Sequence, residues 1–448
     1  MTVAETMAES LLNTQFDDLP DQAIDHAAMI ISSTLASAAY GVNISSAQIV
    51  RDLAKARGGT PEASIWFDPG PKLPLVSAAR VNAMMSDAAA SDDSDLRNIV
   101  HAGTPLTAVS LAVAERTGAS GKDILAAIVT GYEAAGRIGE AISPTFNPHG
   151  HHGCKGAVFG GTIAAARLLK LNTTQTAHAI TLTATSIGGL SVAASTSVAR
   201  EYHAGLAAML SIEAVLAAKM GYTGEMKTLE ASKGFFQVYG GSDGGKVLDG
   251  LGEGWGIVND MALKLVPGGH PYHAFAEAAA DAARSGDIAP DEIVSITASR
   301  PGLTALSGPR HPKDLIDMAH SPAYFLAAGA ADRDFGWANA SSKKILDPVI
   351  HGLIDLIKIG PEPVKNAEKY RQGATVTLET KDGRHETSTV FVPKGAACLG
   401  IDWADVDAKY RALAPHAALD KQQIGASLEI IHDFRNADGA SALIELLR

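Results

Sequence analysis

Alanine-rich segments with the periodicity of α-helices fill the chain up to about residue 265, and this pattern most limits its possible folds. In residues 21–41, DQAIDHAAMIISSTLASAAYG, apolar residues recur at steps of three and four, as on one face of a helix. Many of these segments are apolar nearly all round, so we expect them inside a multi-helix body. Further helices are predicted near residues 76–90, 105–117, 157–170, 175–190 and 203–220.

The amino-acid composition supports the same fold class. Hydrophobic residues make up 46% of the chain but aromatic residues only 5%, and alanine dominates the remainder. Sheet proteins normally need many β-branched and aromatic strands at short, even spacing. The composition therefore argues against an all-β fold and favours helices.

The sequence pattern changes after about residue 270. Two segments, DEIVSITASR and ATVTLETKDGRHETSTVFVP, alternate with a period of two, and Asp382-Gly383 between two such runs predicts a hairpin. We therefore predict a mainly α fold with a large all-helical domain over residues 1–268 and a smaller α+β domain over residues 269–400. The helices of residues 401–448 are expected to return to the large domain.

The net charge and the cysteine content indicate which binding partners and which cellular compartment to expect. The formal charge of −12 repels phosphate backbones, so nucleic acid is not an expected partner. Cys154 and Cys398 form no disulfide framework, and the first residues lack a signal peptide's basic segment, which together predict a cytoplasmic protein. Residues 171–199 carry no charge but are rich in Ser and Thr, so we expect buried helices and no membrane partner.

Two segments match known motifs only in part. Residues 240–246, GGSDGGK, have the spacing of a phosphate-binding loop, but Val247 stands where that loop needs Ser or Thr, so we interpret them as a flexible loop. His149, His151 and His152 lack the spacing of a closed zinc site. A substrate-facing loop is the favoured interpretation there, with a metal site or solvated histidines as alternatives, and we expect no bound metal.

Charged and imidazole side chains gather at three places beside apolar helices. Solvated helix caps would explain the first of these groups equally well. The second opens a very apolar helix, where a lone charge is costly unless an anion meets it. The third lies at the predicted domain junction, a preferred place for a ligand cleft. The groups are Asp92, Asp93, Ser94 and His101; Arg200 and His203; and Lys264, His270 and His273.

Several short motifs follow one another along nearly the whole chain. They are Asp92-Asp93-Ser94 with His101-Ala102-Gly103, Gly131-Tyr132-Glu133, His151 before Phe159-Gly160, Arg200 through Ala208, Gly221 through Gly224, Gly234-Phe235, Lys264 through His273, and Ser321-Pro322-Ala323-Tyr324. Each is weak alone, but their order is specific. In these motifs the chain resembles the MmgE/PrpD family, which includes 2-methylcitrate dehydratase, cis-aconitate decarboxylase and iminodisuccinate epimerase.

The resemblance implies a large helical domain with a smaller α+β lid, a homodimer, no cofactor and a cleft for small di- or tricarboxylates. Carboxylates need charge-assisted donors, and removing a proton beside a carboxylate needs a positioned base and cations. The implied proton-transfer candidates are His101, His270, His273 and Tyr324. The implied substrate-binding candidates are Arg200, Lys264, Asp92, Asp93, Ser94, His151 and His203.

Departures from the family pattern bear on the reaction. Ala90 stands where many dehydratases and decarboxylases have Asp. Arg200 stands where they have a lysine, so a residue that can transfer a proton is replaced by one suited to binding a carboxylate. His270 is an additional imidazole beside His273. We therefore predict a cofactor-independent epimerase of an iminodisuccinate-like dicarboxylate. The alternatives are a lyase that dehydrates 2-methylcitrate or decarboxylates cis-aconitate, and a non-catalytic carboxylate-binding protein.

Overall fold

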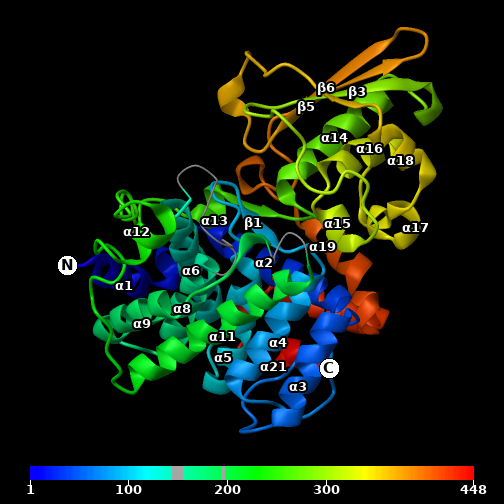
Figure 1. The fold of residues 1–448 in the computed structure, drawn as a ribbon. Helices are drawn as coiled ribbons and strands as arrows, with labels where there is room; N and C mark the ends of the chain where they lie inside the picture. The colour runs from blue at the N-terminus through cyan, green and yellow to red at the C-terminus, as the bar shows by residue number, and fades with distance from the viewer. Residues whose placement is uncertain (144–154, 193–196) are drawn as a thin grey trace. The chain divides into compact units, whose positions relative to one another are not determined.

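The computed structural model describes residues 1–143, 155–192 and 197–448, and these form two compact units (Figure 1). Met1–Leu263 and Asp402–Arg448 make up the large unit, and Lys264–Ile401 make up the small unit. The large unit is helical except for one short two-stranded ladder, whereas the small unit combines helices with a four-stranded sheet. The predicted mainly α fold with a smaller α+β part is confirmed.

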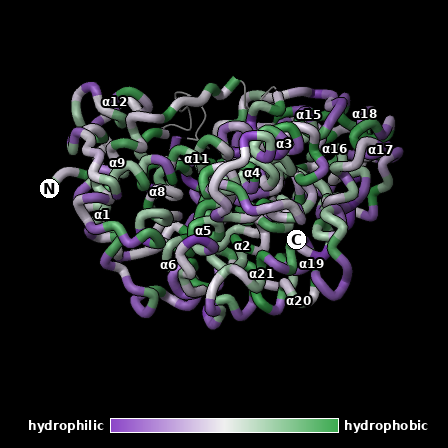
Figure 2. The backbone as a smooth tube through the Cα atoms, turned by 90° about the horizontal axis from the view of Figure 1, so that it is seen from below, coloured by the Kyte–Doolittle hydropathy of each residue, from purple (hydrophilic) through white to green (hydrophobic). Residues whose placement is uncertain are grey.

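The helices of the large unit surround a core of apolar helices. Buried faces extend along α2, α5, α6 and α8, and Figure 2 shows mainly apolar colouring along α2 and α5. The elements before the small unit are α1 (Val3–Asn13), α2 (Asp21–Gly41), α3 (Ser45–Arg57), α4 (Leu75–Ala88), β1 (Asp93–Asp95), α5 (Gly103–Thr117), α6 (Gly121–Ala141), α8 (Ala157–Leu168), α9 (Thr173–Thr185), α11 (Ala199–Lys219), α12 (Phe235–Gly240), α13 (Gly256–Asn259) and β2 (Met261–Leu263). Those after it are α19 (Trp403–Leu413), α20 (Lys421–His432) and α21 (Ser441–Leu446).

Two glycines of the sequence motifs allow α6 and α8 to pack with their backbones in contact. A Cβ atom on Gly131 would lie 2.7 Å from the carbonyl oxygen of Gly160, and one on Gly160 would lie 2.8 Å from that of Gly131. Any larger residue at either position would force the helices apart. The Gly-Tyr-Glu and Phe-Gly motifs therefore serve, in part, to build the core.

Local sequence explains where several helices begin and end. Ser120 and Asp123 form a capping box at the start of α6, because the Ser120 hydroxyl accepts from the Asp123 amide and the Asp123 carboxylate accepts from the Ser120 amide. The helix predicted over 175–190 ends at Thr185, and the one predicted over 203–220 begins earlier, at Ala199. Arg200 and His203 thus lie in the first turn of α11.

The small unit packs helices against one face of a mixed sheet. The strand order is β4-β3-β5-β6, with β3 and β4 parallel and the other pairs antiparallel. The predicted Asp382-Gly383 hairpin joins β5 to β6, and Gly383 takes the positive φ of 84° that the turn requires. The elements are α14 (His270–Ser285), β3 (Ile293–Ser299), α15 (Leu315–Ala319), α16 (Pro322–Asp332), α17 (Ser342–Ile345), α18 (Pro348–Ile354), β4 (Ile357–Ile359), β5 (Ala374–Thr380) and β6 (His385–Val390).

The core of the small unit lies between α14, α16 and the sheet. The inward residues of β5 alternate with partly exposed ones, as expected for a strand with one face on the core. Helix α16 begins at Pro322, because the hydroxyl of Ser321 caps it by accepting a hydrogen bond from the Tyr324 amide. Helix α18 ends at Ile354, before the start of β4.

No single helix among the described residues has the length and apolarity to cross a membrane. Helices α2 and α3 pass such a test only as a pair, and they are bent by 92° at the break between them.

Candidate active site

The short ladder of β1 and β2 positions the first group of predicted residues. Asp93 lies opposite Leu263, and Ser94 lies opposite Ala262. The ladder leads directly into Lys264, the next residue along the chain. Backbone hydrogen bonds between the two strands therefore hold Asp93 and Ser94, both of them predicted substrate-binding residues, in place.

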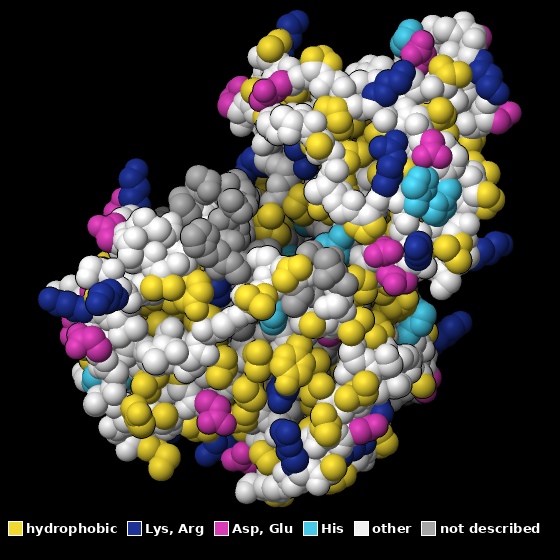
Figure 3. Space-filling view, in the orientation of Figure 1, with side chains coloured by type: hydrophobic (Ala, Val, Ile, Leu, Met, Phe, Trp, Pro, Cys, Tyr) yellow, Lys and Arg dark blue, Asp and Glu magenta, His cyan; other side chains and the backbone are white. Residues whose placement is uncertain are grey.

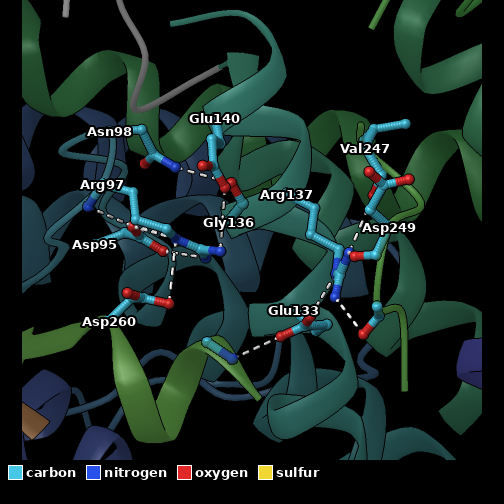
Figure 4. Close-up of polar contacts among 12 residues, drawn as sticks. Asp95, Arg97, Asn98, Glu133, Gly136, Arg137, Glu140, Val247, Asp249 and Asp260 are labelled. Atoms are coloured by element: carbon cyan, nitrogen blue, oxygen red, sulfur yellow. Dashed lines mark hydrogen bonds and ion pairs between the residues drawn. The ribbon is translucent and has the colours of Figure 1, made fainter. Parts of the chain in front are cut away.

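Arg97, two residues after the end of β1, forms an ion-pair network in the large unit. Its guanidinium lies 2.7 Å from an Asp95 oxygen and 3.3 Å from oxygens of Asp260 and Glu140 (Figure 4). The network neutralises one of the three clustered carboxylates of the Asp92–Asp95 segment. Asp95, which is fully buried, and Arg97 therefore support the segment of the first group of predicted residues.

Glu133 of the Gly-Tyr-Glu motif anchors a second network. One carboxylate oxygen accepts from the Gly256 amide at 2.7 Å, and the other contacts Arg137 at 2.5 Å (Figure 4). Arg137 in turn donates to the carbonyl oxygens of Asp249 and Gly250 at 2.6 and 2.8 Å. Glu133, directly and through Arg137, therefore fixes the backbone of the Gly-rich segment that follows α12.

Asp93 caps the helix that follows the site. Its Oδ1 atom accepts a hydrogen bond from the Gly103 amide at 2.8 Å, at the start of α5. A Cβ on Gly103 would lie 2.8 Å from that same oxygen and 2.9 Å from Ile30, so only glycine admits this approach. The Asp-Asp-Ser and His-Ala-Gly motifs are thus bound to each other.

His101 is held by the same segment through its ring. Its Nδ1 atom lies 2.6 Å from the backbone carbonyl oxygen of Asp93, which can only accept, so Nδ1 carries a hydrogen. In the neutral ring Nε2 therefore has the lone pair. Asp92 Oδ2 lies 3.8 Å from Nδ1 and compensates the positive charge that the ring has when both nitrogens are protonated.

The predicted carboxylate holder, Arg200, already meets an anion of the protein. Its Nε lies 3.3 Å from the carboxylate of Asp87, the last-turn residue of α4, and its Nη2 donates to the Asp87 carbonyl. Burial disfavours the charge, but Asp87 and Asp92 raise the pKa of Arg200, so it stays a cation. Asp92 thus links Arg200 electrostatically to His101.

Three other predicted or neighbouring residues complete this group. His203 lies one turn after Arg200 on α11, and burial lowers its pKa. The Ser94 hydroxyl is buried without a hydrogen-bond partner among the described residues. The Lys409 ammonium, 2% exposed, donates to Ser33 at 2.8 Å and to the carbonyl of Ser91, directly before Asp92. Lys409 therefore fixes the start of the site segment.

A second group lies in the small unit, at the start of α14. The Nδ1 atom of His270 donates to the side-chain oxygen of Gln372 at 3.0 Å. Burial, with a smaller effect of the charges of Lys264 and Arg300, lowers the pKa of His270 to about 4, against the hydrogen bond to Gln372, which raises it. His270 is therefore neutral at pH 7, and its buried Nε2 has no hydrogen-bond partner among the described residues.

The ring of His273 packs beside that of His270. Their centroids are 4.9 Å apart, and Phe325 stacks on the other side of His273 at 5.8 Å. Lys264, the predicted cation of this segment, is 2% exposed. The charge of Lys264 acts on His270 and lowers its pKa, so these residues of the small unit interact with one another.

Tyr324, the fourth predicted proton-transfer residue, packs in the hydrophobic core of the small unit. It is fully buried in the small unit's core, and its hydroxyl donates to the Asn339 carbonyl at 2.8 Å. Burial also raises its pKa, so the phenol keeps its proton. We therefore leave Tyr324 out of the proton-transfer groups.

Other expectations concern possible metal and phosphate sites. His149, His151 and His152 lie outside the described residues. Across residues 1–143, 155–192 and 197–448, no group of three His, Cys, Asp or Glu side chains is arranged to hold a metal ion. Residues 240–246 form the end of α12 and a loop, and no helix follows them as a phosphate loop requires.

Sequence reasoning missed Asp87, Gln372, Arg300 and Lys409. Arg300 donates to the Gly373 and Gln372 carbonyls at 2.6 and 2.7 Å, and thereby holds the backbone of the residue that orients His270. Asp87 is 113 positions from Arg200, and Gln372 is 102 from His270. The sequence offered one indication of these partners. Burying the charge of Arg200 is costly, so an anionic partner was expected, but nothing in the sequence identified it as Asp87.

Comparisons with known proteins identify the family of the chain. The MmgE/PrpD N-terminal domain matches residues 5–247, and the MmgE/PrpD C-terminal domain matches residues 267–431. The cis-aconitate decarboxylases of Homo sapiens and Mus musculus are each 23% identical to the chain, over its whole length and over 95% and 93% of their own. A cis-aconitate decarboxylase of Aspergillus terreus is 29% identical over 54% of the chain and 52% of its own length. The chain belongs to the MmgE/PrpD family.

Proposed function

We propose that the chain is a lyase that decarboxylates a small tricarboxylate of the cis-aconitate class. The relatives that match over the full length are named as cis-aconitate decarboxylases, which supports the lyase over the epimerase that the departures from the family pattern suggested. The observation that carries the proposal is His101, whose Nδ1 proton is held by Asp93. That bond leaves Nε2 as the atom that exchanges a proton with the substrate.

The chemistry needs one proton donor and cationic holders. Loss of one carboxyl group as carbon dioxide leaves an electron pair that forms a new carbon–carbon double bond, and the far carbon of the old double bond takes up a proton. In the proposal, doubly protonated His101 supplies that proton from Nε2, and Asp92 compensates its charge beforehand. Substrate carboxylates need charge-assisted donors that remain charged.

Arg200 is the proposed donor to a substrate carboxylate. Nε and Nη2 face Asp87, while Nη1 makes no hydrogen bond among the described residues. A guanidinium offers five N–H donors, so the Asp87 contact leaves donors for a second carboxylate. Arg200 cannot readily exchange a proton, which is consistent with a holding role.

The direct test is release of carbon dioxide from cis-aconitate by the purified chain, compared with H101A. We expect H101A to lose about 10²–10⁴-fold in kcat, as when a general acid/base is removed. H385A, which changes an exposed histidine on β6, should keep full activity. Absence of carbon dioxide from the native chain contradicts the decarboxylase. A new conjugated alkene from 2-methylcitrate would instead indicate a dehydratase.

Epimerisation of an iminodisuccinate-like dicarboxylate is a second candidate, because two imidazoles, His270 and His273, lie side by side. Loss of optical rotation with deuterium uptake in deuterated water would support it. If none of the three reactions occurs while cis-aconitate raises the melting temperature, the chain is a carboxylate-binding protein and the lyase proposal fails. The homodimer and the cytoplasmic location stay predictions.

A further inference from the structure

Two histidines on the surface of the small unit face each other through the same ring atom. The Nδ1 atoms of His311 and His351 are 3.0 Å apart, and the ring centroids are 5.1 Å apart. Figure 3 shows exposed histidine side chains over the region of α17 and α18. Neither residue belongs to the candidate active site, and neither occurs in a sequence motif of the family.

The partners of the other ring nitrogens determine where the hydrogens lie. His311 Nε2 is 3.1 Å from the carboxylate of Asp355, and His351 Nε2 is 2.8 Å from the carbonyl of Ile345. Both partners can only accept, so both Nε2 atoms carry hydrogens. When the rings are neutral, the two Nδ1 lone pairs therefore face each other, and only a cation or an added proton between them makes this contact favourable.

We propose that His311 and His351 bind one divalent transition-metal ion through their Nδ1 atoms. Imidazole nitrogen suits Zn²⁺, Cu²⁺ and Ni²⁺, and metal-binding histidines usually donate their other N–H to a carboxylate or a carbonyl, as both rings do here. For metal–nitrogen bonds of about 2.0–2.1 Å, two ligands are about 2.9 Å apart at 90° and about 3.3 Å apart at the tetrahedral angle. The observed 3.0 Å lies within this interval.

The backbone on both sides of the pair is fixed. Arg310, directly before His311, donates to the carbonyl of Ile354 at 3.0 Å, which holds the loop of His311 against α18. His351 lies within α18, whose start is capped by Asp347. The His311 side chain is 40% exposed, so water can complete the coordination of an ion held by two protein ligands. A bound ion would join this loop to α18.

The proposal is tested by titrating Zn²⁺ alone into the metal-free full chain by calorimetry. We expect H311A and H351A each to bind one Zn²⁺ fewer per chain than the native protein, and the control H385A to bind as the native chain does. His149, His151 and His152 are present in every protein, so any ion bound there cancels in the difference. D355N, which keeps both ligands, should bind about tenfold more weakly because it changes the partner of the His311 ring.

One outcome of the titration would contradict the metal site. Native stoichiometry and affinity in both H311A and H351A would overturn the proposal, and the two rings would then share only a proton. Because protons compete with the ion for Nδ1, Zn²⁺ affinity at this site should also fall as the pH is lowered. The test involves no turnover, so its outcome is independent of the proposed lyase activity.

Discussion

The Nδ1 atom of His101 donates to the backbone carbonyl of Asp93 at 2.6 Å, so a main-chain acceptor holds this atom of the ring. Because β1 and the capping of α5 fix Asp93, substitutions that spare these contacts should leave the ring in place. The proton-transfer role of Nε2 can therefore be separated from the structural role of Nδ1.

Replacement of His101 by Asn makes this separation. The Asn amide can still donate to the Asp93 carbonyl but has no atom at the position of Nε2. We expect H101N to unfold within a few degrees of the native chain while losing about 10²–10⁴-fold in kcat. Thermal unfolding and turnover of cis-aconitate check both expectations, and substantial activity in H101N would exclude His101 as the proton donor.

Gly103→Ala should disturb Asp93 and destabilise the large unit. The added Cβ would lie 2.8 Å from the Asp93 carboxylate and 2.9 Å from Ile30, so one of them must move. Overpacking of this kind typically costs about 1–3 kcal/mol. G425A is the matched control, because a Cβ there meets nothing within 4 Å and Gly425 lies in helix α20. Equal denaturant midpoints for the two variants would contradict this account of the His-Ala-Gly motif.

Gln372 should matter through the orientation of His270. Q372L removes the acceptor of the His270 Nδ1 hydrogen, whereas Q372E keeps an acceptor and adds a negative charge beside the ring. We expect Q372L to lower the pKa of His270 further, because the bond to Gln372 raises it, and Q372E to raise that pKa above its present value of about 4. NMR titration of the His270 ring measures the second effect, and an unchanged titration in Q372E would show that the contact is not made in solution.

Glu277 should make the small unit less stable as the pH rises. Burial raises the pKa of this carboxyl from 4.5 to about 7, against the hydrogen bond from the Lys394 amide. The stabilisation of its neutral form is fully present below pH 4.5 and is lost as the pH rises through 7, by on the order of 3 kcal/mol at most. E277Q should remove this dependence, and E368Q, which changes an exposed carboxyl of the same unit, should keep it. Denaturant unfolding at pH 5 and pH 8 compares them.

Local patterns made much of the fold predictable. Apolar periodicity located the helices of the large unit, and Ser120 with Asp123 and Asp382 with Gly383 gave a helix start and a hairpin turn, because capping and turn chemistry act within a few residues. The C-terminal end of α9 and the start of α11 were misplaced, because no side-chain cap marks either of them.

The candidate site was predictable only as separate groups of residues. Its motifs gave His101, Arg200, His270 and His273, but the partners of Arg200 and His270 lie more than a hundred positions away in the sequence. Asp87 and Gln372 are examples, and no local pattern identifies such residues. Tyr324 is the opposite case: its motif suggested a proton-transfer role, but the residue packs in the core of the small unit.

Incubation of cis-aconitate with the native chain and with H101N in deuterated water tests whether His101 donates the proton in a decarboxylation. We expect the native chain to release carbon dioxide and to yield an unsaturated dicarboxylate with one carbon-bound deuterium, and H101N to do neither at a comparable rate. Native protein that releases no carbon dioxide, or H101N that forms the deuterated product as fast as the native chain, would contradict the proposal.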